Sequence, residues 1–413
     1  MGEGRTWYAA KVGANFVPGR VALRFLLALL CALSLTLPAA VQAAGEPVTI
    51  GLEVPLSPPG DVTAGQLIRR GAELGAEYVN TQMHGVLGRD VALAVEDSAG
   101  QPEQGVAGYR RLVTEKHAVA VTGFFHSSVN IAVNEVAKDV GVPTLATQAS
   151  AADITAKHYD VAFRTHAIDP VRADAFIKLT DKLKARRVAL LAETTDYGIG
   201  NVREFENRVK DDRLNVQVLS ITFDNKSTDL TPQLLQTKNF NPDLIINLGV
   251  GSPMDLIVDQ ATTLGLFPKV PMVVSYDAPI RPQWWQLHAK DGEVYFVSYY
   301  SPQQKLSPAG QWFASAYQKK YGEPPVYSAL QGFGDVLVIA QGVARAKSTD
   351  PKKLIAAFET GSYTTWSAVP ATFPRAQGIF WHNWSPPVLI LHYTAPNQNW
   401  REAPLVTQSG KAA

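Results

Sequence analysis

Short β-rich segments alternate with helical patterns along most of this chain. A strand pattern at 48–52 precedes an amphipathic helical pattern at 66–80. The alternation then continues through 91–95, 102–114, 119–122, 128–139 and 142–145. Repeated strand–helix units predict a parallel sheet with helices on both faces.

A second series begins where Asp169 can cap a helix that opens at Pro170. Further strands are expected at 188–191, 216–221, 244–248 and 272–274. About 370 residues follow position 43, which exceeds the size at which one hydrophobic core keeps growing. We therefore predict an α/β protein with two doubly wound, Rossmann-like lobes in tandem.

The N-terminal segment has the order of a secretory signal peptide. Arg20 and Arg24 precede an apolar run at 25–37, and small residues at 39–44 offer a cleavage site after Ala43. At about 1.5 Å per residue, the run is too short to cross a bilayer core of about 30 Å. We predict a cleaved signal peptide at 1–43 and export to the periplasm; an N-terminal helix of the mature fold and a start codon downstream of Met1 are the alternatives.

Cleavage would remove Cys31, the only cysteine, and with it any thiol, disulfide or cysteine-bound metal. Lipid attachment at Cys31 is the alternative, although the apolar run continues past it. The remaining chain would carry 38 − 4 = 34 basic and 37 − 1 = 36 acidic residues, a net charge of −2. A nearly neutral chain has no electrostatic reason to bind nucleic acid or an anionic membrane.

The turn at 122–128 is the most informative candidate for a binding site, because it follows an apolar strand and opens a helix. Helix N-termini favour anions, and the hydroxyls of Ser127 and Ser128 would add donors suited to a carboxylate. The alternative is that one of these serines only caps its own helix.

Motifs of catalysis are weak in this sequence. The P-loop pattern, the Gly-x-Ser-x-Gly elbow and histidine pairs at i, i+4 are absent. Gly249 and Gly251 begin a dinucleotide-like fingerprint, but Met254 stands at the third glycine position. We expect neither an enzyme nor a bound cofactor or metal.

Six blocks carry a resemblance to a known family. They are Gly51-Leu-Glu-Val-Pro-Leu-Ser57, Gly71-Ala-Glu-Leu-Gly-Ala76, Gly123 to Ser128, Gly141-Val-Pro-Thr144, Phe163-Arg-Thr165 and Asp196-Tyr-Gly198. In their order and spacing, residues 48–393 resemble the type I periplasmic binding proteins, especially the branched-chain amino-acid-binding group of ABC importers. The resemblance implies two lobes joined by a crossing-strand hinge that closes on a small ligand.

The resemblance also implies roles for individual residues. Ser127 would bind the ligand carboxylate, and Ala149 and Ser150 would offer a carbonyl and a hydroxyl to the ligand amine and carboxylate. Tyr197 would lay its ring against the ligand on closure, with a core tyrosine as the alternative. Asp277 is the candidate partner for a ligand ammonium group, and the alternative is that it caps a helix at 282–287.

Two departures from the family pattern concern the ligand. Val62, Thr63 and Ala64 stand where an aromatic residue is expected, and Val250 replaces a tyrosine, which puts a plain branched-chain amino acid in doubt. His126 precedes Ser127 and could donate to a ligand oxygen, titrating near neutrality unless its surroundings shift it; packing is the alternative.

The predicted lobes are 46–167 with 300–385, and 168–299 with 386–405, followed by a disordered tail at 406–413. The function we predict is capture of a small carboxylate-bearing solute, such as an amino acid, organic acid or amide. A monomer would hand this solute to an ABC permease and ATPase complex in the inner membrane. A ligand sensor that presents its closed form to a receptor kinase or regulator is the alternative, and an exported hydrolase is a third possibility.

Overall fold

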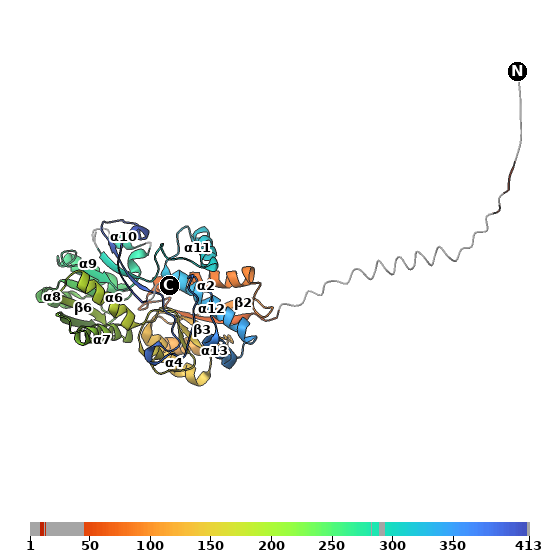
Figure 1. The fold of residues 1–413 in the computed structure, drawn as a ribbon, viewed down its shortest axis with the longest axis horizontal. Coiled ribbons are helices and arrows are strands. Elements are labelled where there is room, and N and C mark those ends of the chain that lie inside the picture. The colour runs from red at the N-terminus through yellow and green to blue at the C-terminus, as the bar shows by residue number, and fades with distance from the viewer. Residues whose placement is uncertain (1–8, 12, 14–44, 282, 289–293, 411–413) are drawn as a thin grey trace, which may run out of the picture. The chain divides into compact units, whose positions relative to one another are not determined.

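The structure is a computed structural model that describes residues 9–11, 13, 45–281, 283–288 and 294–410. The chain divides into two units, Met1–Gly45 and Glu46–Ala413. Cys31 and the predicted cleavage site lie outside the described residues. All helices and strands among the described residues belong to the second unit and are shown in Figure 1.

The first sheet is parallel throughout, with the strand order β2-β1-β3-β4-β5. Its strands are β1 (Val48–Val54), β2 (Val91–Asp97), β3 (Val121–Phe124), β4 (Thr144–Ala146) and β5 (Ala162–Arg164). Most of these residues are buried, as expected of a parallel sheet covered on both faces. The prediction of a parallel sheet from the first strand–helix series is confirmed.

Helices from both ends of the unit pack on this sheet, and together they form what we call the first lobe. They are α2 (Val62–Gln82), α3 (Pro102–Thr114), α4 (Ser127–Val140), α5 (Asp153–Ala156), α11 (Pro308–Tyr321), α12 (Tyr327–Ala346) and α13 (Pro351–Thr360). Helices α2 and α12 approach closely because Gly71 faces the backbone of Ala329, where an added Cβ would lie 1.9 Å from the carbonyl oxygen.

The second sheet, in what we call the second lobe, has the order β12-β11-β10-β9-β8-β6-β7. Its strands are β6 (Arg187–Glu193), β7 (Gln217–Phe223), β8 (Leu244–Leu248), β9 (Met272–Val274), β10 (Val294–Ser298), β11 (Val388–Tyr393) and β12 (Leu405–Ser409). Strands β6–β10 pair in parallel, whereas β11 pairs antiparallel with both of its neighbours, β10 and β12. The helices are α6 (Asp169–Lys182), α7 (Asp196–Asp211), α8 (Thr231–Phe240), α9 (Ser252–Thr263) and α10 (Trp284–Leu287).

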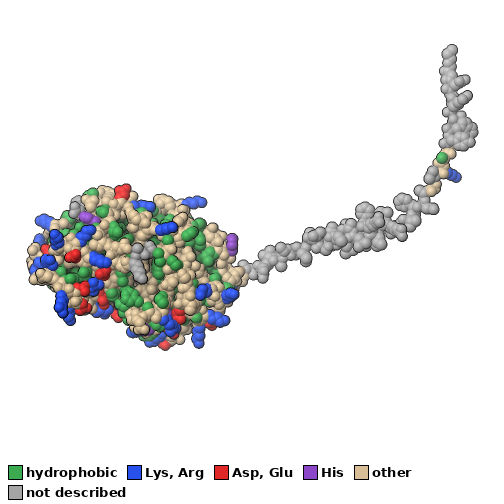
Figure 2. Space-filling view, in the orientation of Figure 1, with side chains coloured by type: hydrophobic (Ala, Val, Ile, Leu, Met, Phe, Trp, Pro, Cys, Tyr) green, Lys and Arg blue, Asp and Glu red, His purple; other side chains and the backbone are tan. Residues whose placement is uncertain are grey.

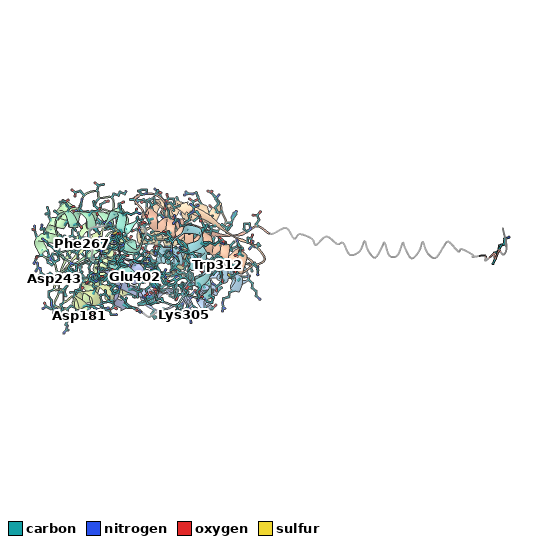
Figure 3. All side chains as sticks on the ribbon, turned by 90° about the horizontal axis from the view of Figure 1, so that it is seen from above. Asp181, Asp243, Phe267, Lys305, Trp312 and Glu402 are labelled. Carbon is teal, nitrogen blue, oxygen red and sulfur yellow. The ribbon has the colours of Figure 1, made fainter. Side chains whose placement is uncertain are left out.

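Within the described part of the chain, the backbone passes between the two sheets three times: after β5, after β10 and before β11. The predicted lobe boundaries at 167/168, 299/300 and 385/386 fall in these connecting segments. Short 3-10 helices at Ala278–Ile280, Gly378–Phe380 and Trp400–Glu402 complete the fold. Figure 3 shows Trp312 of α11 toward one end of the folded unit, and Phe267 and Asp243 toward the other.

The prediction of a disordered tail at 406–413 is wrong for residues 406–409, and residues 411–413 lie outside the described residues. Residues Leu405–Ser409 form β12, an edge strand that pairs antiparallel with β11. Lys178 and Lys182 of α6 donate to the carbonyls of Gln408 and Val406 at 2.9 and 3.0 Å. The two lysine bonds span more than 200 residues. Together with the pairing to β11, they give the segment an order that its short, basic-looking sequence did not indicate.

Two further features describe the exterior. Among the described residues, no helix is both long enough and apolar enough to cross a membrane. On the face shown in Figure 2, basic and acidic side chains are interspersed over the folded unit.

Candidate functional site

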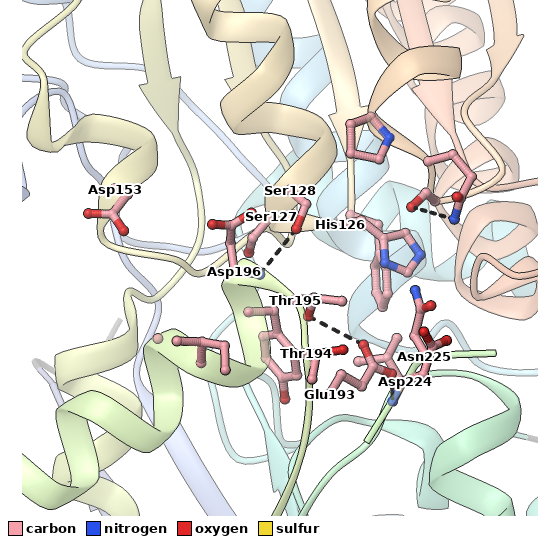
Figure 4. Close-up of a pocket in the computed structure, with 18 of the residues that line it drawn as sticks. His126, Ser127, Ser128, Asp153, Glu193, Thr194, Thr195, Asp196, Asp224 and Asn225 are labelled. Atoms are coloured by element: carbon pink, nitrogen blue, oxygen red, sulfur yellow. Dashed lines mark hydrogen bonds between the residues drawn. The ribbon is translucent and has the colours of Figure 1, made fainter. Parts of the chain in front are cut away.

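A pocket of about 420 Å³ lies between the lobes, at the carboxyl ends of strands from both sheets. The first lobe lines it with Gly100, Gln101, Pro102, Phe125, His126, Ser127, Ser128 and Asp153. The second lobe adds Glu193, Thr194, Thr195, Asp196, Tyr197, Ile199, Gly200, Arg203, Asp224, Asn225, Lys226, Val250 and Tyr276. Figure 4 shows the start of α4 and the start of α7 meeting at this pocket.

Ser127 is the first residue of α4 and is only 2% exposed. Its Oγ accepts a hydrogen bond from the backbone N–H of Ala151 at 3.2 Å, and His126 stands at the N-cap without a capping side-chain bond. Ser128 Oγ accepts from the N–H of Asp196 at 3.1 Å. The capping alternative is therefore wrong for both serines, because each bonds outside its own helix.

The Ser128–Asp196 bond joins the N-terminus of α4 in the first lobe to that of α7 in the second. Helix α7 begins after Thr195, whose hydroxyl accepts from the N–H of Gly198. First-turn N–H groups have no partners within a helix, and each N-terminus carries about half a positive charge. Two such ends at one pocket favour an anionic group between them.

His126 follows β3, is half-buried as a residue and lines the pocket. Its Nε2 accepts from the N–H of Asp61 at 3.2 Å, and its ring packs edge-on against Phe125. Burial lowers the pKa of His126 to about 4, although the charge of Asp61 opposes the shift. Titration near neutrality is therefore not found, because the imidazole is desolvated and serves as an acceptor.

Tyr197 is 5% exposed and lines the pocket from the first turn of α7. Its phenol oxygen accepts from Arg172 Nη2 at 3.0 Å and bonds Ser275 Oγ, so the second lobe holds the hydroxyl in place. The ring lies 5.3 Å from that of Tyr276. Tyr276 in turn donates to the carbonyl of Gln148 in the first lobe at 2.8 Å. The two rings therefore give the pocket an aromatic surface. Residues 62–64, where the family pattern predicts an aromatic side chain, do not supply one.

Ala149 and Ser150 are fully buried and are not among the residues that line the pocket. The carbonyl of Ala149 accepts from Arg164 Nη1 at 3.4 Å, and that of Ser150 accepts from the N–H of Asp169 at 3.0 Å. The Ala149 carbonyl expected to meet the ligand amine therefore serves an internal hydrogen bond, and the Ser150 hydroxyl expected to meet the ligand carboxylate is buried outside the pocket lining.

Asp277 is also absent from the pocket lining and is fully buried. Its Oδ1 lies 3.2 Å from Arg281 Nη2, and its Oδ2 accepts from Ser328 Oγ at 3.0 Å. The helix-capping alternative is wrong, because the short helix α10 begins after Gln283 and Asp277 makes no capping bond.

Arg281 also reaches into the first lobe, where its Nη1 lies 2.9 Å from Asp61 Oδ2. Asp61, Asp277 and Arg281 are all at least 94% buried, and we call them the interlobe ion triad. Asp61 additionally caps α2 by accepting from the N–H of Ala64. An Asp placed before Val62-Thr63-Ala64 is a typical N-cap signal, which would have started this helix earlier than residue 66.

Two other residues were missed by sequence analysis. Arg172 of α6 is fully buried and donates to Asn201, Tyr197 and the carbonyl of Ser275. It shares the buried face of α6 with Phe176 and Leu179, so the helical period carried a signal. Glu193 ends β6 and is 2% exposed. Its place at the carboxyl end of a strand was the available indication.

Comparison with known proteins agrees with this architecture. The model of the family described as "Periplasmic binding protein" matches residues 47–385. A Leu/Ile/Val-binding protein homolog of Brucella abortus is 25% identical over 333 residues, covering 76% of this chain and 82% of that protein. The leucine-, isoleucine-, valine-, threonine- and alanine-binding protein of Pseudomonas aeruginosa is 24% identical over 330 residues, covering 79% and 86%.

Solved structures show the same fold. A leucine-binding protein of Thermotoga maritima has a TM-score of 0.74 at 22% identity, covering 88% of this chain and 98% of that one. A solute-binding protein of an ABC transporter from R. palustris, in complex with benzoate, also has a TM-score of 0.74, at 20% identity and with 89% and 98% covered. The family model matches most of the chain, and the two-sheet fold with a pocket between the lobes agrees with it. This chain therefore belongs to the periplasmic binding protein family.

Proposed function

We propose that this protein captures a small carboxylate-bearing solute between its lobes in the periplasm and delivers it to the permease of an ABC importer. The observation that carries the proposal is the meeting of two helix N-termini, joined by Ser128 and Asp196, at a pocket lined from both lobes. The relatives add support, since the amino acids and the benzoate in their names all carry a carboxylate.

The mechanism we propose is closure driven by the ligand. Ser127 and Ser128 belong to the first lobe and Thr195 and Tyr197 to the second, so a solute can contact all four only when the lobes are together. Such contacts exist in the closed form alone and shift the open–closed equilibrium toward it. If the ligand's contacts in the closed form are about 3 kcal/mol more favourable than those in the open form, the ratio of closed to open molecules changes more than a hundredfold. The permease would then recognise the closed surface.

Replacing Ser127 with alanine tests the carboxylate site. Ser127→Ala should weaken solute binding by about 1–2 kcal/mol, because a hydrogen-bond donor at the N-terminus of α4 is lost. The solute is first identified by mass spectrometry of what freshly purified protein releases on denaturation, and its affinity is then measured by calorimetry. Ser315→Ala, an exposed serine on α11, is the matched control and should bind as wild type does. Unchanged affinity in Ser127→Ala would show that the ligand carboxylate does not bind at the N-terminus of α4.

A further inference from the structure

A buried carboxylate joins the ends of three strands in the first sheet. Asp335 lies on α12, is fully buried and does not line the solute pocket. Its Oδ2 accepts hydrogen bonds from Thr122 Oγ1 at 2.9 Å and from Thr147 Oγ1 at 2.7 Å, and its Oδ1 accepts from Thr165 Oγ1 at 2.6 Å. Gln331 Nε2 donates to the same Oδ1 at 3.0 Å. A carboxylate has about four acceptor positions, so these donors fill them.

Each of the three threonines stands where a strand ends. Thr122 belongs to β3, Thr147 follows β4 and Thr165 follows β5. These strands are neighbours in a parallel sheet, so their carboxyl ends lie at the same edge, where a ligand is expected. The chain continues from them into the turn before Ser127, the turn that holds Ala149, and the connection to the second lobe. One carboxylate therefore joins the starts of three segments beside the pocket.

Thr147 links Asp335 to the turn that leads into α4. The backbone turns at Gly123, where φ is +99°, and the N–H of Gly123 donates to Thr147 Oγ1 at 2.8 Å. A hydroxyl has a single hydrogen, so Thr147 accepts from Gly123 and donates that hydrogen to Asp335. The carbonyl of Phe124 also accepts from the N–H of Thr147 at 3.2 Å. The orientation of the Thr147 hydroxyl therefore helps to place the chain just before Ser127.

The surroundings of Asp335 suit an acceptor. Burial raises the pKa of Asp335 to about 7, whereas the bonds from the threonines and Gln331 favour its ionised form. Tyr327 of α12 and His166 of the connecting segment bond each other at 2.9 Å. Both are neutral, because burial holds the pKa of the tyrosine well above its ordinary value and that of the histidine well below. Above pH 7 Asp335 therefore acts as an acceptor that fixes the direction of the threonine hydroxyls.

We propose that Asp335 is a positioning residue of the solute site: through Thr147 it holds the turn before α4 where the N-terminus of this helix can meet the solute carboxylate. This inference rests on the proposed function and adds to it a residue that does not touch the solute. A shift of the turn at Gly123 would move Ser127 and the first N–H groups of α4, and hydrogen bonds weaken steeply as their angle departs from linearity. Affinity should therefore depend on the Thr147 hydroxyl, although Thr147 does not line the pocket.

The experiment removes the Thr147 hydroxyl while keeping the branched shape of the side chain. The purified full chain is screened by thermal shift against the twenty L-amino acids and benzoate, and the tightest binder is titrated by calorimetry at pH 8. Thr147→Val should weaken its binding about tenfold, the scale of one hydrogen bond to a charged group. Thr147→Ser keeps the hydroxyl and should bind within about twofold of wild type.

A double-mutant cycle separates positioning from a general loss of stability. In the Ser127→Ala protein, Thr147→Val should weaken binding by at most about threefold, because part of what Thr147 positions is already gone. Thr180→Val is the matched control. Thr180 is 2% exposed on α6 and donates to the carbonyl of Phe176 at 2.8 Å, away from the turn. This variant should bind as wild type does, whatever its melting temperature.

The outcomes separate this inference from the proposed function. Wild-type affinity in Thr147→Val, or the same tenfold loss with and without Ser127→Ala, overturns the positioning role and leaves carboxylate capture standing. If Thr147→Val does not fold, Asp335→Asn tests the same link, because an amide offers one oxygen where the carboxylate offers two. Asp335→Asn should also weaken binding, and wild-type affinity in it overturns the proposal. Binding of none of the probes by the wild-type chain overturns the proposed function together with this inference.

Discussion

Replacing Arg281 with methionine should lower the free energy of unfolding by about 3–5 kcal/mol, the cost of leaving buried charges without their partner. Arg281 lies 2.9 Å from Asp61 and 3.2 Å from Asp277, and neither carboxylate has another cation paired with it in the described structure. Burial acts to lower the pKa of the Arg281 guanidinium, but the two acids outweigh it and raise the pKa above its ordinary value, so the group stays charged. Urea unfolding at pH 7.5, followed by circular dichroism, measures the change.

Arg69→Met is the matched control for Arg281→Met. Arg69 pairs with Glu73 on the exposed side of α2, where the arginine side chain is 47% exposed. Surface pairs of this kind contribute less than about 1 kcal/mol. Similar losses in the two variants, or a loss below about 1 kcal/mol in Arg281→Met, would show that the interlobe ion triad does not stabilise the fold.

Replacing Tyr197 with alanine should weaken solute binding by about 2 kcal/mol, or roughly thirtyfold, since the ring is a large apolar surface facing the pocket from the second lobe. The phenol is engaged by Arg172 and Ser275, so the hydroxyl holds the ring in place. Tyr197→Phe keeps the ring and should bind within about threefold of wild type. Calorimetry with the co-purified solute measures both variants.

Two results would contradict this role of Tyr197. Wild-type affinity in Tyr197→Ala would show that the ring does not contact the ligand and that Tyr197 contributes no second-lobe surface to the site. An equal loss in Tyr197→Phe would show that the phenol oxygen, and not the ring, contributes to binding.

The sequence predicted those features of the fold that depend on residues close together along the chain. The strand–turn–helix transitions at Ser127 and Tyr197 follow from apolar runs and neighbouring turn residues, and both helices start within one residue of the matched blocks. The α/β fold class followed from the same periodicity.

The sequence could not predict what depends on contacts between distant segments. Asp61 and Arg281 are 220 residues apart, so nothing local indicated that Arg281 would engage the acid expected to meet a ligand. The same holds for Glu193, whose partner Val250 lies 57 residues away. The low pKa of His126 comes from burial by the folded lobes, which no single segment encodes.

Small-angle X-ray scattering tests most directly the claim that the lobes close on a solute. The protein is measured as purified, after unfolding, dialysis and refolding to remove bound solute, and again after the released solute is added back. We expect a larger radius of gyration after removal and a return to the smaller value on re-addition, because a ligand that bridges α4 and α7 stabilises the closed form. Equal radii in all three samples, with calorimetry showing that the solute binds, would contradict closure on the solute.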